Sequence, residues 1–210
     1  MTTYKKNITV IIFYFLSLNI FGQKLNDFYT SFSERMVMHT LNFDENGIVR
    51  IGSIRRHMSP FHEVFGTYEK RNDSIYIKLY KINFIDLPKA KNFGLESFSE
   101  LSLTLYQNNS ELIDLKNRTV YVTSRKLNRK RIKRKSISFI NGKKYIYEIP
   151  VFDGYGLISR MPHKNKRFDK ALAEVLKNPN EYKTNVIRGL SAYQKFGLIG
   201  INGISIITKN

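Results

Sequence analysis

The stretch SISFINGKKYIYEI, residues 136–149, carries the strongest local fold signal in the chain. Its centre is Asn141-Gly142, a pair that readily adopts the positive φ angles required at both central positions of a type I′ turn. Such a turn joins two antiparallel strands, so residues 136–149 are predicted to form a β-hairpin. An antiparallel β fold is therefore expected around it.

Two more hairpins are predicted upstream. Residues 37–54 alternate in polarity on either side of residues 44–47, and residues 65–82 do so on either side of residues 71–73. Alternation with a period of two indicates strands that are buried on one face only. In the later pair one face carries Ile75, Ile77 and Leu79, and the other carries Tyr76, Lys78 and Tyr80.

The first large unit is assigned to residues 23–150. Residues 101–106 and 119–123 continue the strand pattern, while residues 84–99, with Pro88, are predicted to form a long excursion between strands. About six to eight short strands with short turns favour a meander, a curled sheet or a small barrel. This unit is expected to be antiparallel and β-rich.

The periodicity changes at Lys166. Apolar residues then recur at helical spacing until Asn178-Pro179, which ends the predicted helix. A short strand at 185–187, a helical turn at 190–196 and a last strand at 203–208 are expected to follow. Residues 151–210 are therefore predicted to form a small α+β module, and the fold class of the whole chain is predicted to be α+β.

The segment 178–209 contains an ordered series of motifs: NPNE (178–181), VIRGLSA (186–192) and FGLIGINGISIITK (196–209). In order and spacing, this series resembles the plug domain of TonB-dependent outer-membrane receptors, as found on short exported proteins. The resemblance implies a folding signature of strand, helix and strand, with no catalytic group in it. The plug-like structural motif consists here of Gly189, Ala192, Phe196, Gly197, Gly200, Asn202, Gly203, Thr208 and Lys209.

The match departs from the family in three ways. Phe196 replaces the usual tyrosine, and Ile207-Thr208 replaces a Thr-Thr pair. A receptor of this class also needs a transmembrane barrel of about 22 strands, for which this chain is too short. The resemblance therefore implies a plug-like module without the receptor's barrel. Within it, Gly197 is expected to adopt a left-handed conformation after the helix that ends at Phe196.

The N-terminus has the pattern of a secretory signal peptide. Lys5 and Lys6 precede an uncharged, mostly apolar run from Ile8 to Gly22, shorter than the roughly 20 residues that span a bilayer. Residues 1–22 are predicted to be removed, with an uncleaved anchor as the alternative. The chain has no cysteine, which excludes lipidation at cysteine, disulfides and thiolate metal sites. The expected location is the periplasm or the outer membrane.

The chain is strongly basic, with a formal net charge of +18. Residues 125–135 contain no acidic residue and favour contact with an anionic membrane surface or another polyanion. The alternative interpretation is a solvated β-hairpin tip. The candidates for anionic contact are Arg125, Lys126, Arg129, Lys130, Arg131, Lys133, Arg134 and Lys135.

No catalytic, metal or cofactor site is predicted. His57 and His62 lack the helical spacing of zinc ligands, with Pro60 between them, and His39 and His163 are isolated. The serines lack a nucleophile-elbow motif, and no Gly-rich phosphate loop or assignable pair of catalytic carboxylates occurs. A non-enzymatic protein without a metal ion or cofactor is expected.

Aromatic residues are concentrated near the second hairpin, at Phe61, Phe65, Tyr68, Tyr76 and Tyr80. They are predicted to be core residues, and the alternative is a cupped sheet that holds an apolar ligand.

The predicted function is that of an exported, non-enzymatic binding or interaction protein of the cell envelope. An envelope protein is the expected partner. The alternatives are a ligand-binding β-barrel-like protein and a basic binder of membrane surfaces or polyanions. Binding to nucleic acid is not expected, and the oligomeric state is left open.

Overall fold

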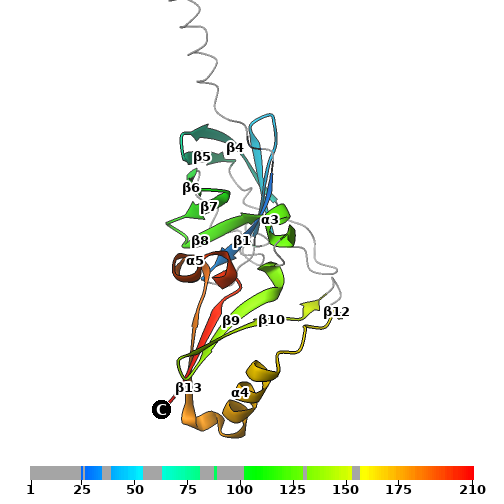
Figure 1. The fold of residues 1–210 in the computed structure, drawn as a ribbon. Coiled ribbons are helices and arrows are strands. Elements are labelled where there is room, and N and C mark those ends of the chain that lie inside the picture. Colours follow the sequence, from blue (N-terminus) through cyan, green and yellow to red (C-terminus); the bar gives the residue numbers. More distant parts are fainter. Residues whose placement is uncertain are drawn as a thin grey trace, which may run out of the picture.

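The computed structural model describes residues 25, 27–34, 39–53, 63–80, 88, 102–129, 132–152 and 157–210. Eight antiparallel strands form a closed barrel, and four later strands form a separate sheet. Figure 1 shows the barrel at one end of the molecule and the four-stranded sheet at the other. The barrel strands are β1 (Phe28–Ser33), β2 (His39–Phe43), β3 (Ile48–Ser53), β4 (Glu63–Arg71), β5 (Ser74–Leu79), β6 (Ser102–Asn108), β7 (Glu111–Asp114) and β8 (Thr119–Thr123).

The barrel interior is filled by its own side chains. The alternation of each strand turns one set of residues inward, so that Ile75 and Ile77 are buried while Tyr76 between them is 46% exposed. The inward set forms one hydrophobic cluster, as in small eight-stranded barrels whose interior is a core. Its members are Tyr29, Leu41, Phe43, Val49, Ile51, Val64, Ile75, Ile77, Leu79, Leu103, Leu105, Leu112 and Tyr121.

The predicted fold class was wrong. The expected fold was α+β, with a meander or small barrel-like sheet as its first unit. The chain is instead predominantly β, with a closed eight-stranded barrel, and its helices are minor elements. Closure depends on antiparallel pairing of β1 with β8, from Tyr29 opposite Thr123 to Ser33 opposite Thr119. Because β1 and β8 lie far apart in the sequence, their pairing could not be predicted from a local sequence pattern. Strands β1 and β7 were also not predicted.

The three predicted hairpins are confirmed. Strands β2 and β3 pair around residues 44–47, and β4 and β5 pair around the turn that contains Asn72. In the third, β9 (Lys135–Ile140) pairs with β10 (Lys143–Glu148). Asn141 and Gly142 both have positive φ angles, 48° and 78°, as the type I′ turn requires.

The third hairpin belongs to the four-stranded sheet, whose order is β10-β9-β14-β13. Strand β14 (Ile204–Lys209) lies parallel to β9 and antiparallel to β13 (Tyr182–Ile187). The predicted domain boundary at residue 150 therefore passes through one sheet. The other elements of this half are α3 (Ser124–Arg129), η3 (Ile132–Arg134), β11 (Val151–Phe152), β12 (Ile158–Arg160), α4 (Lys166–Lys177), η4 (Pro179–Glu181), α5 (Gly189–Phe196) and η5 (Gly197–Gly200).

Helices cover both faces of this sheet. On one face α4 packs Phe168 against Tyr147, with the two rings stacked at 4.1 Å between centroids. On the other face Phe196 of α5 lies 5.5 Å from the ring of Phe139. The helix predicted from Lys166 to Asn178 is thus confirmed as α4. Among the described residues, no helix combines the length and the apolar character needed to cross a bilayer.

The prediction that the second hairpin's aromatic residues are core was wrong for three of them. Phe65, Tyr76 and Tyr80 are 40%, 46% and 55% exposed on the outside of the barrel. Tyr68 is half-buried, and the carbonyl oxygens of Leu25 and Asp44 lie 2.8 Å and 2.9 Å from its hydroxyl, whose single proton can be donated to either. The alternation itself placed Tyr76 and Tyr80 opposite the apolar face of Ile75, Ile77 and Leu79, so face pattern was a better guide to burial than aromatic character. Several predictions concern residues outside the described part of the chain: the leader, His57, Phe61, His62 and the excursion at 84–99 apart from Pro88.

Candidate functional site

Helix α5 joins the sheet to the barrel through a close backbone approach at Gly189. This residue has a φ of 55°, and an added Cβ would lie 2.5 Å from the Glu34 nitrogen and 2.9 Å from the Arg118 carbonyl oxygen. The next residue, Leu190, donates its N–H to that same carbonyl oxygen at 3.2 Å. Glycine is therefore required at position 189 for two reasons: its φ angle is positive, and there is no room for a Cβ atom.

Apolar side chains from both halves meet at this junction. Val120 and Val122 point outward from β8, yet both are fully buried because helices cover them. We call this group the junction cluster: Phe32, Val120, Val122, Leu127, Ile132, Leu190 and Ile201. It makes the end of the barrel and the C-terminal half one packed body.

A polar network borders the junction cluster. The Arg118 guanidinium donates to Glu34 at 2.9 Å and to the Ser191 hydroxyl at 2.7 Å, and that hydroxyl donates to Glu34 at 2.7 Å. The hydrogen bond from Arg118, followed by that from Ser191, lowers the pKa of Glu34 below its usual value. The three side chains come from the barrel and from α5, so the network joins the two halves.

The lowered pKa predicts a dependence of stability on pH. Because the pKa of Glu34 is lower in the folded state, its contribution is present above the ordinary value of 4.5 and is lost as pH falls through the lowered pKa. Arg118→Met should therefore lower the urea midpoint at pH 7 and change it less under acid conditions. Urea unfolding of both proteins from pH 7 to pH 3 measures this. A difference that stays constant over that range would contradict it.

A second polar group lies deeper in the junction. Glu111 is 2% exposed and forms an ion pair with Lys126 of α3. Lys126 also donates to the Ser110 hydroxyl at 2.7 Å, and the Tyr193 hydroxyl of α5 donates to Glu111 at 3.4 Å. Burial first, and then the charge of Glu111, raises the pKa of Tyr193. These contacts join β7, α3 and α5.

The basic run 125–135 is therefore not a uniform contact surface. Lys126 is neutralised by Glu111, whereas Arg125 is exposed. The interpretation as a hairpin tip was wrong, because the run forms α3 and η3 and buries Leu127 and Ile132 in the junction cluster. Arg134 and Lys135 are half-buried. The side chains of Arg129, Lys130, Arg131 and Lys133 lie outside the described part of the chain.

The plug-like residues hold a tight turn between α5 and β14. Gly197 follows α5 with φ 61° and ψ −152°, so its φ is positive as expected, but its ψ lies outside the left-handed helical conformation that was predicted, in a region that only glycine visits readily. A Cβ at Gly200 would lie 2.7 Å from the carbonyl oxygen of Ala192, which is fully buried. Gly203 has a φ of 98°.

The remaining motif residues make specific contacts. The Asn202 amide donates to the carbonyl oxygens of Ile132 and Lys135, both at 2.7 Å, which fixes the chain entering β9. Lys209 forms an ion pair with Glu181 at 3.0 Å, and Thr208 is exposed next to it in β14. The motif residues thus maintain local structure, and none of these contacts forms a catalytic arrangement.

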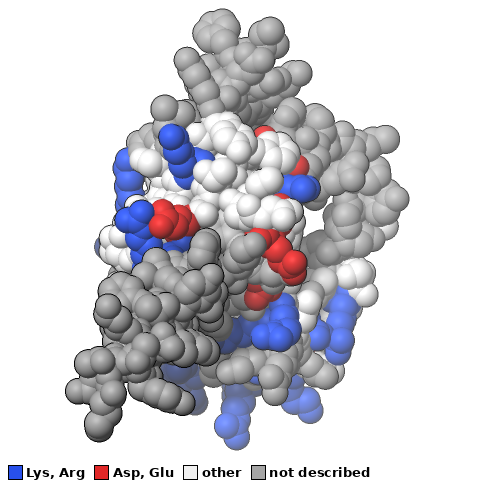
Figure 2. Space-filling view, turned by 90° about the horizontal axis from the view of Figure 1, so that it is seen from above, with Lys and Arg blue, Asp and Glu red and all other residues white. Residues whose placement is uncertain are grey.

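The two halves differ strongly in charge. Residues 25–124 contain twelve basic and twelve acidic residues, whereas residues 125–210 contain twenty basic and five acidic residues. Figure 2 looks onto the barrel end, where red and blue side chains both occur. In the C-terminal half, exposed cations of α4 are Lys166, Arg167, Lys170 and Lys177. The net charge is evident from the sequence, but this separation of charge becomes visible only once the barrel is known to end with β8 at Thr123.

The two described histidines, His39 and His163, lie in different parts of the structure and form different hydrogen bonds. His39 is buried at the start of β2, and its backbone N–H donates to the Ser31 hydroxyl at 2.6 Å. His163 is exposed and donates its backbone N–H to Glu148. Within the described ranges, no group of three or more His, Asp or Glu side chains is arranged to hold a metal ion.

Comparison with known proteins gives little further information. No protein-family model and no curated protein matches the chain. A solved structure that resembles it is that of an uncharacterized protein from Bacteroides eggerthii DSM 20697, with 12% sequence identity and a TM-score of 0.33. The similarity covers 48% of this chain and 98% of that chain. A likeness this weak carries no argument about fold or function.

Proposed function

We propose that this chain is an exported, non-enzymatic binding protein of the cell envelope, and that its C-terminal half binds an anionic surface. The observation that supports this proposal is the separation of charge, with a balanced barrel and a strongly basic half from residue 125 onward. A concentrated positive field attracts anionic partners, and each Lys or Arg near an anionic membrane contributes about 1 kcal/mol. In this proposal the barrel is a rigid body that carries the binding half.

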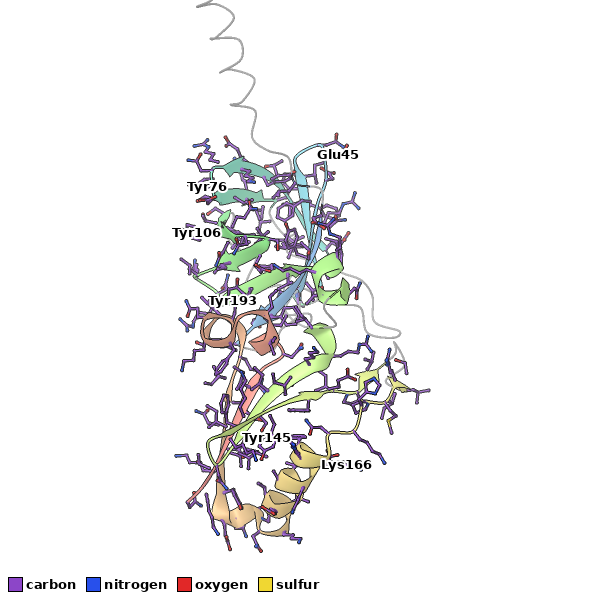
Figure 3. The ribbon with its side chains drawn as sticks, in the orientation of Figure 1. Glu45, Tyr76, Tyr106, Tyr145, Lys166 and Tyr193 are labelled. Atoms are coloured by element: carbon purple, nitrogen blue, oxygen red, sulfur yellow. The ribbon has the colours of Figure 1, made fainter. Side chains whose placement is uncertain are left out.

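The exposed cations around the start of α4 are the best candidates for this contact. Lys164, Lys166 and Arg167 are exposed next to one another, and Lys166 projects from the first turn of α4 in Figure 3. The apolar face of the same helix is engaged with the sheet through Phe168 and Val175. The polar face of α4 is therefore available to bind while its apolar face supports the fold.

Replacing Lys164, Lys166 and Arg167 by Gln should weaken binding to anionic vesicles by about 100-fold, because about 1 kcal/mol is lost per cation. Residues 23–210 are used, without the predicted leader, and partitioning is measured by vesicle sedimentation at several salt concentrations. Binding of the unaltered protein should fall steeply as salt rises.

The matched control replaces Arg50 and Lys78, which are exposed on the barrel, and half-buried Lys70 with Gln. It removes the same charge from the other half and should leave most binding intact. If both triple variants lost the same amount of vesicle binding, binding would depend on the net charge of the protein and not on the cations at the start of α4. Absence of vesicle binding by the unaltered protein would refute the proposal.

An envelope protein remains a second candidate partner. Strand β13 is an edge strand of the sheet, and its residues Lys183 to Val186 are exposed. Exposed edge strands can accept a strand from another protein. A photo-crosslinking residue at Thr184 should then capture one specific protein from envelope fractions, and a crosslinker at Thr104 on the barrel should not. Lack of a specific product at Thr184 would argue against this candidate.

A further inference from the structure

Exposed apolar residues and exposed cations both occur in the short segment that leads into α4. Leu157, Ile158 and Met161 are 68%, 49% and 72% exposed. Single exposed apolar residues are common on protein surfaces, but three within five residues of one segment are a candidate interaction site. We call the whole group the amphiphilic edge: Leu157, Ile158, Arg160, Met161, Lys164, Lys166 and Arg167.

The segment carrying the amphiphilic edge is held at both ends. Strand β12 pairs with β11, and the Ser159 hydroxyl donates to the carbonyl oxygen of Val151 at 3.1 Å. Further on, the Asn165 amide nitrogen donates to the carbonyl oxygen of Ile146 at 3.1 Å. The Asn165 amide oxygen accepts the N–H of Phe168 and caps α4. These hydrogen bonds hold the segment that carries the exposed apolar side chains between β11 and the start of α4.

We propose that the amphiphilic edge inserts into the interface of an anionic bilayer, with Leu157, Ile158 and Met161 entering the acyl boundary. This inference rests on the proposed function and identifies its anionic surface as a lipid membrane. Interfacial binding combines burial of apolar groups with attraction of cations to anionic head groups. The exposed cations that flank and separate the apolar residues supply the second component, and their long stems can reach head groups while the apolar residues insert.

The charge pattern favours a membrane over other occupants. A polyanion without a hydrocarbon region would engage the cations and leave the three apolar side chains in water. An apolar protein groove would engage the apolar side chains and leave Arg160, Lys164 and the start of α4 unpaired. An anionic bilayer satisfies both sets within one interface, since charged and apolar layers lie next to each other in it.

The absence of tryptophan from the chain allows a direct test. Met161→Trp places a single reporter in the amphiphilic edge, and Tyr106→Trp places one on the barrel, where Tyr106 is 43% exposed and points outward in Figure 3. Both variants of residues 23–210 are mixed with vesicles of phosphatidylglycerol and phosphatidylcholine. We expect blue-shifted emission and quenching by bromine-labelled acyl chains for Met161→Trp only.

A second variant separates insertion from attraction. Replacing Leu157, Ile158 and Met161 by Ser should lower vesicle partitioning at least about tenfold, because apolar burial is lost while all charges remain. Unchanged partitioning of this variant, or no quenching of Met161→Trp while the protein is bound, would overturn the inference and leave the proposed anionic binding standing. If the unaltered protein binds no anionic vesicles, the proposed function fails as well. Matching urea midpoints confirm that the variants are folded.

Discussion

Gly189→Ala is expected to lower the free energy of unfolding by about 2–5 kcal/mol. A left-handed conformation of an L-residue costs about 1–2 kcal/mol, and the φ of Gly189 is 55°. Overpacking a tight site costs a further 1–3 kcal/mol, roughly, and the new Cβ would meet backbone atoms of Glu34 and Arg118 below 3 Å. These atoms belong to the barrel and cannot rotate away. Urea unfolding of the purified variant measures the loss.

The matched control for this variant is Gly142→Ala. Gly142 also has a positive φ, 78°, but nothing lies within 4 Å of its added Cβ. Only the conformational cost should then appear, about 1 kcal/mol. The difference between the two variants isolates the close approach of α5 to the barrel. Equal losses at the two sites would mean that the junction is not tightly packed at Gly189.

Local structure could be predicted from the sequence where residues close in the chain determine it. The Asn141-Gly142 turn has the expected positive φ angles because both residues tolerate them. Helix α4 begins at Lys166 and ends before Pro179 because its apolar spacing and its terminating residues agree. In these segments the signal and the structure lie within the same few residues.

Barrel closure and the junction could not be predicted, since they depend on residues far apart. Gly189 was included in the plug-like motif. The structure requires glycine there because the backbone of Glu34 and Arg118 lies against it, and both residues are far from Gly189 in the sequence. Lys126 was counted among the candidates for anionic contact, yet it is paired with buried Glu111. Strand β7 is only Glu-Leu-Ile-Asp, and nothing in this short sequence marks Glu111 as a buried carboxylate that needs a partner.

The position of α5 explains how one short helix affects both halves. Leu190 belongs to the junction cluster, whereas Ala192 is buried against the sheet with Ile137 and Ile204. Residues two apart on a helix face different directions, so α5 can fill both interfaces at once. Substitutions that move α5 should therefore lower the stability of the barrel and the sheet together. The C-terminal half is therefore expected to be held rigidly relative to the barrel.

Lys126→Met should lower the free energy of unfolding by about 3 kcal/mol, because it leaves the Glu111 carboxylate buried without its partner. The side chain of Lys126 is 24% exposed, so water relieves part of the cost and the lower end of the usual range applies. Arg125→Met, next to it and exposed, should change stability by less than about 0.5 kcal/mol. Urea unfolding at pH 7 measures both.

The double variant Glu111→Gln/Lys126→Met tests whether charge is the cause. It removes both charges, and Gln keeps the shape of Glu and can accept the hydrogen bond from Tyr193. If the loss in Lys126→Met comes from an uncompensated buried carboxylate, the double variant should recover most of it, since replacing both partners is far cheaper than removing one. If the double variant is as unstable as the single one, Lys126 acts by packing against β7, and the ion pair is not what holds α3 to the barrel.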